Sequence, residues 1–176
     1  HGEEFQEHGG LLHGRTQYEE LLRVPLVFAG PGIPRGKVVD QPVSLVDLLP
    51  TILGRLGIAA PARLDGLDLA PAWSGGALPE RLLFGEADHN NVIDGKPVID
   101  IKRMARLGHE KLHFDRHDEE TQLFVVGRDP GEQRELSTSS PQRVALLRAA
   151  LTRFLDGAVT GQESGAELSP ENLELL

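Results

Sequence analysis

A stretch rich in proline and glycine, IAAPARLDGLDLAPAWSGGALPE at residues 58–80, limits what the chain can fold into more than any other feature. This composition interrupts helices and strands, so it predicts a long connection. A continuous apolar run and one amphipathic helix precede it, and short alternating segments and another helix follow it. We therefore expect the C-terminal part of an α/β domain over residues 1–78 and a small α+β subdomain over residues 79–157. Residues 158–176 are expected to form a linker and a truncated helix.

The first unit contains a candidate buried strand. VPLVFAG at Val24–Gly30 is continuous and apolar, contains β-branched residues, and is closed by GPGIP. Runs of this kind are typical of strands buried on both faces in a parallel sheet. The expected fold class is α/β, with the C-terminal end of a mixed, mostly parallel sheet sandwiched by helices. A small α+β subdomain of antiparallel strands and one helix would follow.

The segment SLVDLLPTILGRLG at residues 44–57 has the strongest helical pattern in the chain. Ser44 suits the N-cap, and Asp47 stands three residues on, close to a capping box. Leucine and isoleucine recur along one face, and Gly57 is placed to end the helix. Pro50 either costs about 3 kcal/mol inside a single helix or marks the start of a second helical segment after a separate turn.

Four short strand-like segments follow the connection: RLLFGEA, PVIDIKRMA, EKLHFD and TQLFVVG. The pair Asp94-Gly95 between the first two is a tight-turn signal, which favours antiparallel strands. In SSPQRVALLRAALTRFLDG, Ser140 and Pro141 are expected to begin a helix with one apolar face. This half of the chain therefore predicts an antiparallel sheet covered by one helix.

Composition argues against several kinds of protein and site. The net charge is −9, which argues against general nucleic-acid binding, because phosphate contacts need clustered Lys and Arg. The chain has no cysteine, so disulfides and thiolate metal sites are excluded within it. No run of about 18 apolar residues occurs, so no membrane span is expected. The first residue is histidine rather than methionine, and we expect a fragment of a longer protein.

The motif HEKLH at His109–His113 matches the H-E-x-x-H pattern. In that pattern two histidines one helical turn apart bind zinc, and the glutamate acts as a general base. Here Leu112 and Phe114 alternate with polar residues, which is the period of a strand. On a strand the two histidines would lie about 13 Å apart, too far to share one ion. We therefore favour a solvated strand edge, and a zinc protease stays an alternative.

Four further segments occur in order at close spacing: HGEEFQEHG, HGRTQYEELLRVPLVFAGPGIP, PVSLVDLLPTILGRLGI and LDGLDLAP. Together they resemble the C-terminal portion of a sulfatase of the alkaline-phosphatase-like superfamily. LFVVGRDPGEQREL resembles the strand and turn of that family with its D-P-x-E-x-x-x-L pattern, and LSPENLELL resembles a tail common in its bacterial members. The charged N-terminal segment is then expected to be half of an active site at the end of a parallel strand.

The resemblance implies a divalent-cation site. The family has an Asp-Asn or Asp-His pair followed by Gly that ligates the cation. His1 and Gly2 match the second and third positions, so His1 is the expected metal ligand. Calcium is the usual ion of the family, but it prefers oxygen ligands, and an imidazole leaves manganese, magnesium and zinc open. The formylglycine nucleophile of the family arises from a C/S-x-P-x-R context and is expected upstream; the one such spelling in this chain, SSPQR at residues 139–143, stands at the start of the predicted C-terminal helix and not near the charged N-terminal segment.

The resemblance also points to residues that would contact the sulfate ester. The family places a cation, often Lys, shortly before its Y-E element, where this chain has no Lys. His13 lies one residue from that position and is the expected anion contact or proton donor, because imidazole titrates near neutral pH. Arg15 is the second candidate, since its guanidinium matches sulfate oxygens; its alternative is a surface pair with Glu19. His8 is a further candidate for substrate binding, or else a hydrogen-bonding residue of the loop.

The implied activity is that of a sulfuric ester hydrolase whose substrate is a sulfated small molecule or carbohydrate. Its nucleophile and its first metal ligands would come from a missing N-terminal half, so the chain alone is expected to be inactive. The family suggests a periplasmic or extracellular location, which the residues themselves do not determine. Two alternatives stay open: a phosphodiester or phosphonate monoester hydrolase of the same superfamily, and a non-catalytic binding or packing module.

Overall fold

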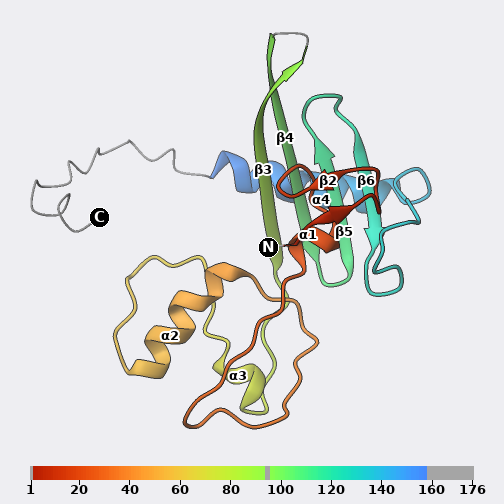
Figure 1. Ribbon diagram of the computed structural model, residues 1–176. Helices are drawn as coiled ribbons and strands as arrows, with labels where there is room; N and C mark the ends of the chain where they lie inside the picture. The colour runs from red at the N-terminus through yellow and green to blue at the C-terminus, as the bar shows by residue number, and fades with distance from the viewer. Residues whose placement is uncertain (1, 94–95, 158–176) are drawn as a thin grey trace, which may run out of the picture.

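The computed structural model describes residues 2–93 and 96–157, without the side chains of residues 88–100. It contains two antiparallel sheets and several short helices (Figure 1). No helix in this described part is both long and apolar enough to cross a bilayer. The elements are β1 (Glu4–Phe5), β2 (Leu11–Leu12), α1 (Glu19–Leu22), η1 (Leu45–Asp47), α2 (Leu48–Leu56), α3 (Ala70–Trp73), β3 (Leu82–Ile93), β4 (Lys96–Leu107), β5 (Glu110–Asp115), β6 (Thr121–Val125) and α4 (Pro141–Asp156).

The four-stranded sheet has the strand order β3-β4-β5-β6, and each strand runs antiparallel to its neighbour. These strands cover the four predicted segments, so the prediction of an antiparallel sheet is confirmed. The predicted turn at Asp94-Gly95 lies outside the described residues. On one face of the sheet, buried Leu112 and Leu123 pack against α4, which begins at Pro141 as expected.

The helical segment before the long connection folds as a turn followed by a helix. The 3₁₀ helix η1 ends at Asp47, and α2 starts at Leu48. Pro50 therefore lies in the first turn of α2, where a backbone N–H would have no partner inside the helix. The backbone N–H of Ser44 donates to Asp47 Oδ2 at 2.8 Å, as in the predicted capping box. Gly57 ends α2 in the left-handed region with φ 66°, also as predicted.

The Asp47 carboxylate is fully buried and joins three parts of the chain. Besides the bond to its own helix, its Oδ1 accepts the Leu67 N–H at 2.8 Å. The carboxylate also forms an ion pair with Arg81, the residue just before β3. Asp47 thus holds the long connection against η1 and against the start of the sheet.

The predicted strand at Val24–Gly30 is wrong, because the segment has no regular secondary structure. Val27 is 83% exposed, and Phe28 packs on Trp73 with ring centroids 5.0 Å apart. A strand needs a neighbouring backbone to satisfy its N–H and C=O groups, and the described residues give this segment none. Every strand pair within the described residues is antiparallel, so the mostly parallel sheet is not formed by them.

The apolar face of α2 points outward. Leu49, Ile52 and Leu56 are exposed, so the predicted stripe is present but has no cover within the described residues. A small cluster of Leu69, Ala72 and Leu78 forms the separate core near α3. The mixture of helices and strands agrees with the expected α/β class, and the proposed division of the chain at residue 78 stays a prediction.

Replacing Asp47 with alanine should lower the free energy of unfolding by about 3 kcal/mol, because Arg81 loses its carboxylate and two backbone N–H groups lose their acceptor. Urea unfolding measures this change beside the variant Asp40→Ala, which removes an exposed carboxylate. Equal stability of the two variants would contradict the role assigned to Asp47.

Candidate functional site

The N-terminal segment, defined as residues 2–23, lies over the sheet face opposite α4 (Figure 1). Its hydrogen bonds reach β5, β6 and the loop after β6. Along β5, Leu112 packs toward α4, whereas Lys111 and His113 contact the N-terminal segment. This division follows from the alternation of side chains along a strand. The sheet therefore carries an apolar core on one face and a polar cluster on the other.

Gly2 lies directly against α1. Its N–H donates to the Leu21 carbonyl at 3.3 Å, and a Cβ at Gly2 would overlap the carbonyl oxygen of Glu20. Glycine is the residue that allows so close an approach of two backbone segments. This agrees with the glycine of the expected His-Gly pair, while His1 lies outside the described residues.

His13 and Arg15 lie on the exposed side of the N-terminal segment. Nδ1 of His13 is 2.5 Å from Oε1 of Glu3, and the His13 side chain is 48% exposed. Arg15 is also exposed. Its alternative pair with Glu19 is not formed, because Glu19 binds two cations of the sheet instead. A guanidinium and an imidazole two residues apart thus remain at the surface of the described structure.

His8 occupies a different environment from His13. Its Nδ1 is 2.6 Å from Glu20 Oε1, and its Nε2 is 3.2 Å from the carbonyl oxygen of Glu132. The ring stacks on Tyr18, with centroids 3.6 Å apart and planes inclined by 3°. Because both oxygens are acceptors, a charged imidazole can donate from both nitrogens. These contacts agree with the alternative in which His8 is a hydrogen-bonding residue of the loop, and substrate binding by His8 stays a prediction.

The pKa of His8 is raised above its ordinary value. Burial acts to lower this pKa, but the hydrogen bonds to the Glu20 carboxylate and the Glu132 carbonyl outweigh burial. The folded state then binds the His8 proton more tightly than the unfolded state does. These contacts therefore stabilise the fold fully at pH below the ordinary pKa of histidine, and the stabilisation is lost as the pH rises through the raised pKa.

A buried carboxylate, Glu132, lies at the centre of the polar cluster. It belongs to the D-P-G-E sequence in the loop after β6. Nε2 of His113 lies 2.8 Å from its Oε1, Nζ of Lys111 lies 3.1 Å from the same oxygen, and the Glu19 N–H donates to Oε2 at 2.6 Å. Reasoning from the sequence missed this cluster. The available signals were the D-P-x-E pattern and the polar residues that alternate along the predicted strand.

The cluster favours the ionised form of Glu132 and the neutral form of His113. Burial acts to raise the pKa of Glu132, but the hydrogen bond from His113 and the charge of Lys111 outweigh it, so this pKa is lowered. Burial also lowers the pKa of His113; the hydrogen bond to Glu132 opposes this, and the charge of Lys111 adds to it. A neutral His113 therefore donates the hydrogen on Nε2 to a charged Glu132.

A pocket of about 190 Å³ opens between the N-terminal segment and strands β4 to β6. Two cations in its lining are paired, since Lys102 binds Asp115 and Arg103 binds Glu86, while the Glu120 carboxylate accepts a hydrogen bond from the Gln122 amide. Of the residues expected to contact substrate, His8 lines this pocket. The lining residues are His8, Thr16, Gln17, Tyr18, Lys102, Arg103, His113, Phe114, Asp115, Glu120 and Gln122.

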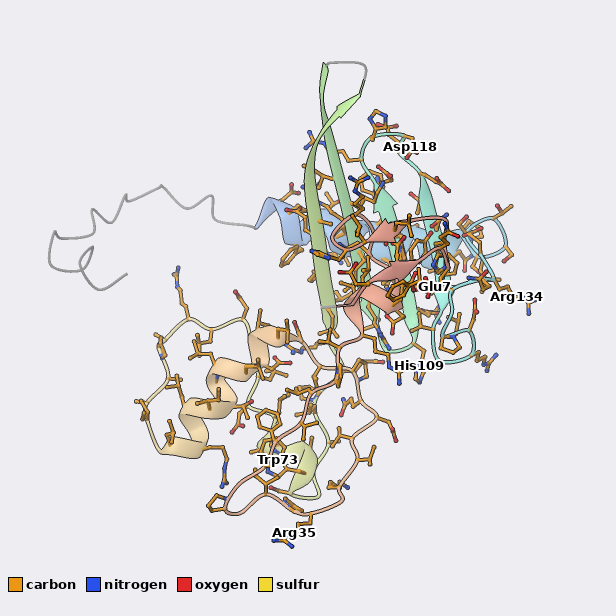
Figure 2. All side chains as sticks on the ribbon, viewed as in Figure 1. Glu7, Arg35, Trp73, His109, Asp118 and Arg134 are labelled. Atoms are coloured by element: carbon orange, nitrogen blue, oxygen red, sulfur yellow. The ribbon has the colours of Figure 1, made fainter. Side chains whose placement is uncertain are left out.

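The H-E-x-x-H motif does not form a zinc site. Residues Glu110–Asp115 form β5, so the helix that a zinc protease requires is absent and that alternative is wrong. The favoured strand is confirmed, but the expectation of a solvated edge fails at buried His113. His109 lies at the opposite end of the sheet from Asp118 (Figure 2). Among the side chains that the structure describes, no three His, Asp or Glu residues are placed to hold one metal ion.

Comparison with known proteins places the chain among sulfatases. Residues 1–58 match the family model described as Sulfatase. A Delta 4,5-hexuronate-2-O-sulfatase of Bacteroides thetaiotaomicron is 30% identical over 167 residues, covering 89% of this chain and 34% of that protein. Arylsulfatase K of Homo sapiens is 44% identical over 152 residues, covering 81% of this chain and 27% of that protein.

Solved structures agree with these relatives. A 2-O GAG sulfatase superposes with a TM-score of 0.71 at 28% identity, covering 85% of this chain and 33% of that chain. A phosphonate monoester hydrolase from Silicibacter pomeroyi superposes with a TM-score of 0.64 at 24% identity, covering 90% and 33%, and shares the fold. The chain spans 34% of the length of the first of these relatives, about a third. It belongs to the sulfatase family, within the alkaline-phosphatase-like superfamily.

Proposed function

We propose that the protein containing this chain hydrolyses sulfate esters, and that the chain forms the C-terminal portion of the enzyme. The observation that carries this proposal is the match of residues 1–58 to the Sulfatase family, because this range holds each residue of this chain that is expected to act in catalysis. The relatives named for hexuronate and GAG sulfates favour a sulfated carbohydrate as the substrate.

His13 is proposed as the anion contact or the proton donor to the leaving oxygen. The Glu3 carboxylate at 2.5 Å orients the imidazole through Nδ1. A positioned imidazole is well suited to proton transfer near neutral pH, and the partly exposed setting of His13 leaves room for a substrate to approach. The more enclosed His8 is assigned a smaller part in substrate binding.

Arg15 is proposed as the group that binds the sulfate oxygens. Arg15 is exposed, and Glu19 pairs with Arg106 and Lys111 instead of with Arg15. A guanidinium can donate two parallel hydrogen bonds to two oxygens of one sulfate group.

His1 is proposed as one ligand of a divalent cation, with calcium first and manganese, magnesium or zinc as alternatives. Gly2, which follows His1 in the proposed pair, lies directly against α1. The other ligands and the formylglycine nucleophile are proposed to come from a part of the protein outside this chain. A bound cation would stabilise negative charge on the sulfate.

Replacing His13 with glutamine in the full-length protein should lower kcat by about 100-fold or more on a sulfate ester with a poor leaving group, because proton transfer is lost. A nitrophenyl sulfate, whose leaving group needs little protonation, should show a smaller loss. The matched control is His117→Gln, which changes an exposed histidine elsewhere. Equal losses on both substrates would argue against His13 as the proton donor.

Replacing Arg15 with lysine should raise KM for a sulfate ester by about tenfold, because lysine keeps the charge but loses the two-point contact with sulfate. Steady-state kinetics on the full-length protein measure this change. Arg35→Lys is the control, since Arg35 is exposed and lies at the far end of the molecule from the sheet (Figure 2). An unchanged KM in the Arg15 variant would exclude sulfate binding by this residue.

The alternative activity is phosphonate monoester or phosphodiester hydrolysis, which the shared fold leaves open. Matched aryl sulfate and aryl phosphonate substrates, assayed side by side on the full-length protein, separate the two activities. We expect a larger kcat/KM for the sulfate. A larger kcat/KM for the phosphonate would replace the proposed function, and no turnover of either would favour a non-catalytic module.

A further inference from the structure

We propose that Glu132 is a positioning residue, which fixes the N-terminal segment and its His8 imidazole against strand β5. The geometry stands without reference to any activity. Only the kinetic part of the test rests on the proposed function.

The loop after β6 presents Glu132 in an unusual backbone conformation. Its φ is 49°, in the left-handed region that non-glycine residues seldom adopt. The Glu132 N–H donates to the Asp129 carbonyl at 3.0 Å, and the Asp129 carboxylate accepts the Arg134 N–H at 2.7 Å. The turn therefore holds the carboxylate of Glu132 inward, where its side chain is 0% exposed.

The carboxylate receives donors from two elements far apart in sequence. The first N–H of α1, at Glu19, donates to Oε2, while Lys111 and His113 of β5 approach Oε1. Charges balance within the cluster, because Lys111 also binds the Glu19 carboxylate, which Arg106 reaches at 3.2 Å. An ion cluster that is paired in this way can be buried, whereas an unpaired carboxylate would be strongly unfavourable.

The backbone of the same residue contacts His8. The Glu132 carbonyl accepts from Nε2 of His8 at 3.2 Å, and Gln133 lies 3.3 Å from that nitrogen. Tyr18 stacks on His8 and lies 4.7 Å from the His113 ring centroid. Glu132 thus contacts this row of three rings at both ends, because its carbonyl accepts from His8 and its carboxylate accepts from His113.

The groups that face His8 come from α1, from Tyr18 just before it, and from the loop after β6. Glu20 of α1 pairs with Nδ1, Tyr18 covers the ring, and the loop after β6 supplies the Glu132 carbonyl and the Gln133 amide. Lys111 and His113 of β5 lie behind Glu132. A shift of the turn at Glu132 would therefore displace His8 and the start of α1 together.

Glutamine cannot replace this carboxylate. Both oxygens of Glu132 accept hydrogen bonds from N–H donors, so the NH₂ group of an amide would meet a donor at either position. The substitution Glu132→Gln keeps the shape of the side chain and removes the charge and one acceptor. It is therefore a direct test of positioning.

The test compares Glu132→Gln with Glu119→Gln in the full-length protein, because Glu119 is an exposed carboxylate at the turn before β6. The pKa of each histidine is measured from the exchange of its ring C2 hydrogen, read by mass spectrometry. Backbone hydrogen exchange is measured on the same samples. In Glu132→Gln we expect the His8 pKa to fall and amides of the N-terminal segment to exchange about tenfold faster. Strands β4 and β5 and α4 should stay protected, and Glu119→Gln should match the wild type.

Kinetics give the second readout. The value of kcat/KM for a sulfate ester should fall about tenfold in Glu132→Gln, and Glu132→Asp, which keeps the charge on a shorter side chain, should recover part of it. If Glu132→Gln fails to fold, Glu132→Asp is measured in its place, and we expect smaller changes in amide exchange and His8 pKa in the same direction. Exchange and His8 titration equal to those of Glu119→Gln would overturn the positioning role. Changed exchange and titration in a protein that hydrolyses no sulfate ester would overturn the proposed function and leave the positioning role standing.

Discussion

The buried carboxylate of Glu132 is the interaction on which the placement of the N-terminal segment depends. Leu21 of that segment is buried, but Phe5, Leu11 and Leu12 are exposed, so apolar packing alone holds it weakly. Polar contacts therefore hold the N-terminal segment on the sheet. Their strength comes from burial, because a paired carboxylate in a place that excludes water becomes very unfavourable once any of its donors moves away.

The two faces of the antiparallel sheet thus have different structural roles. The face toward α4 is an ordinary apolar core around Leu112, Leu123 and Leu147. The opposite face carries Lys111 and His113, which both bind the Glu132 carboxylate. A single short strand therefore links a stable core to the segment that carries the residues proposed for sulfate-ester chemistry.

Local patterns in the sequence predict the local parts of this fold. The strands β3 to β6 follow from alternation, and the capping box at Ser44 and the left-handed Gly57 follow from helix-end chemistry. The strand predicted at Val24–Gly30 fails because its formation depends on neighbours that its own residues do not specify. The burial of Lys111 and Glu132 is not predictable from the sequence for a related reason. Both residue types are usually exposed, and their burial here follows from partners far away in sequence. The candidates His13 and Arg15 came from likeness to the sulfatase family, since nothing in their spacing alone identifies a sulfate site.

The outward apolar face of α2 has a practical consequence for handling the chain. The exposed apolar side chains along η1, α2 and the residue after Gly57 are Leu45, Val46, Leu49, Ile52, Leu56 and Ile58. An exposed apolar surface of this kind promotes self-association in water. Preparations of these 176 residues by themselves are therefore expected to need a solubilising fusion or a mild detergent to remain monodisperse.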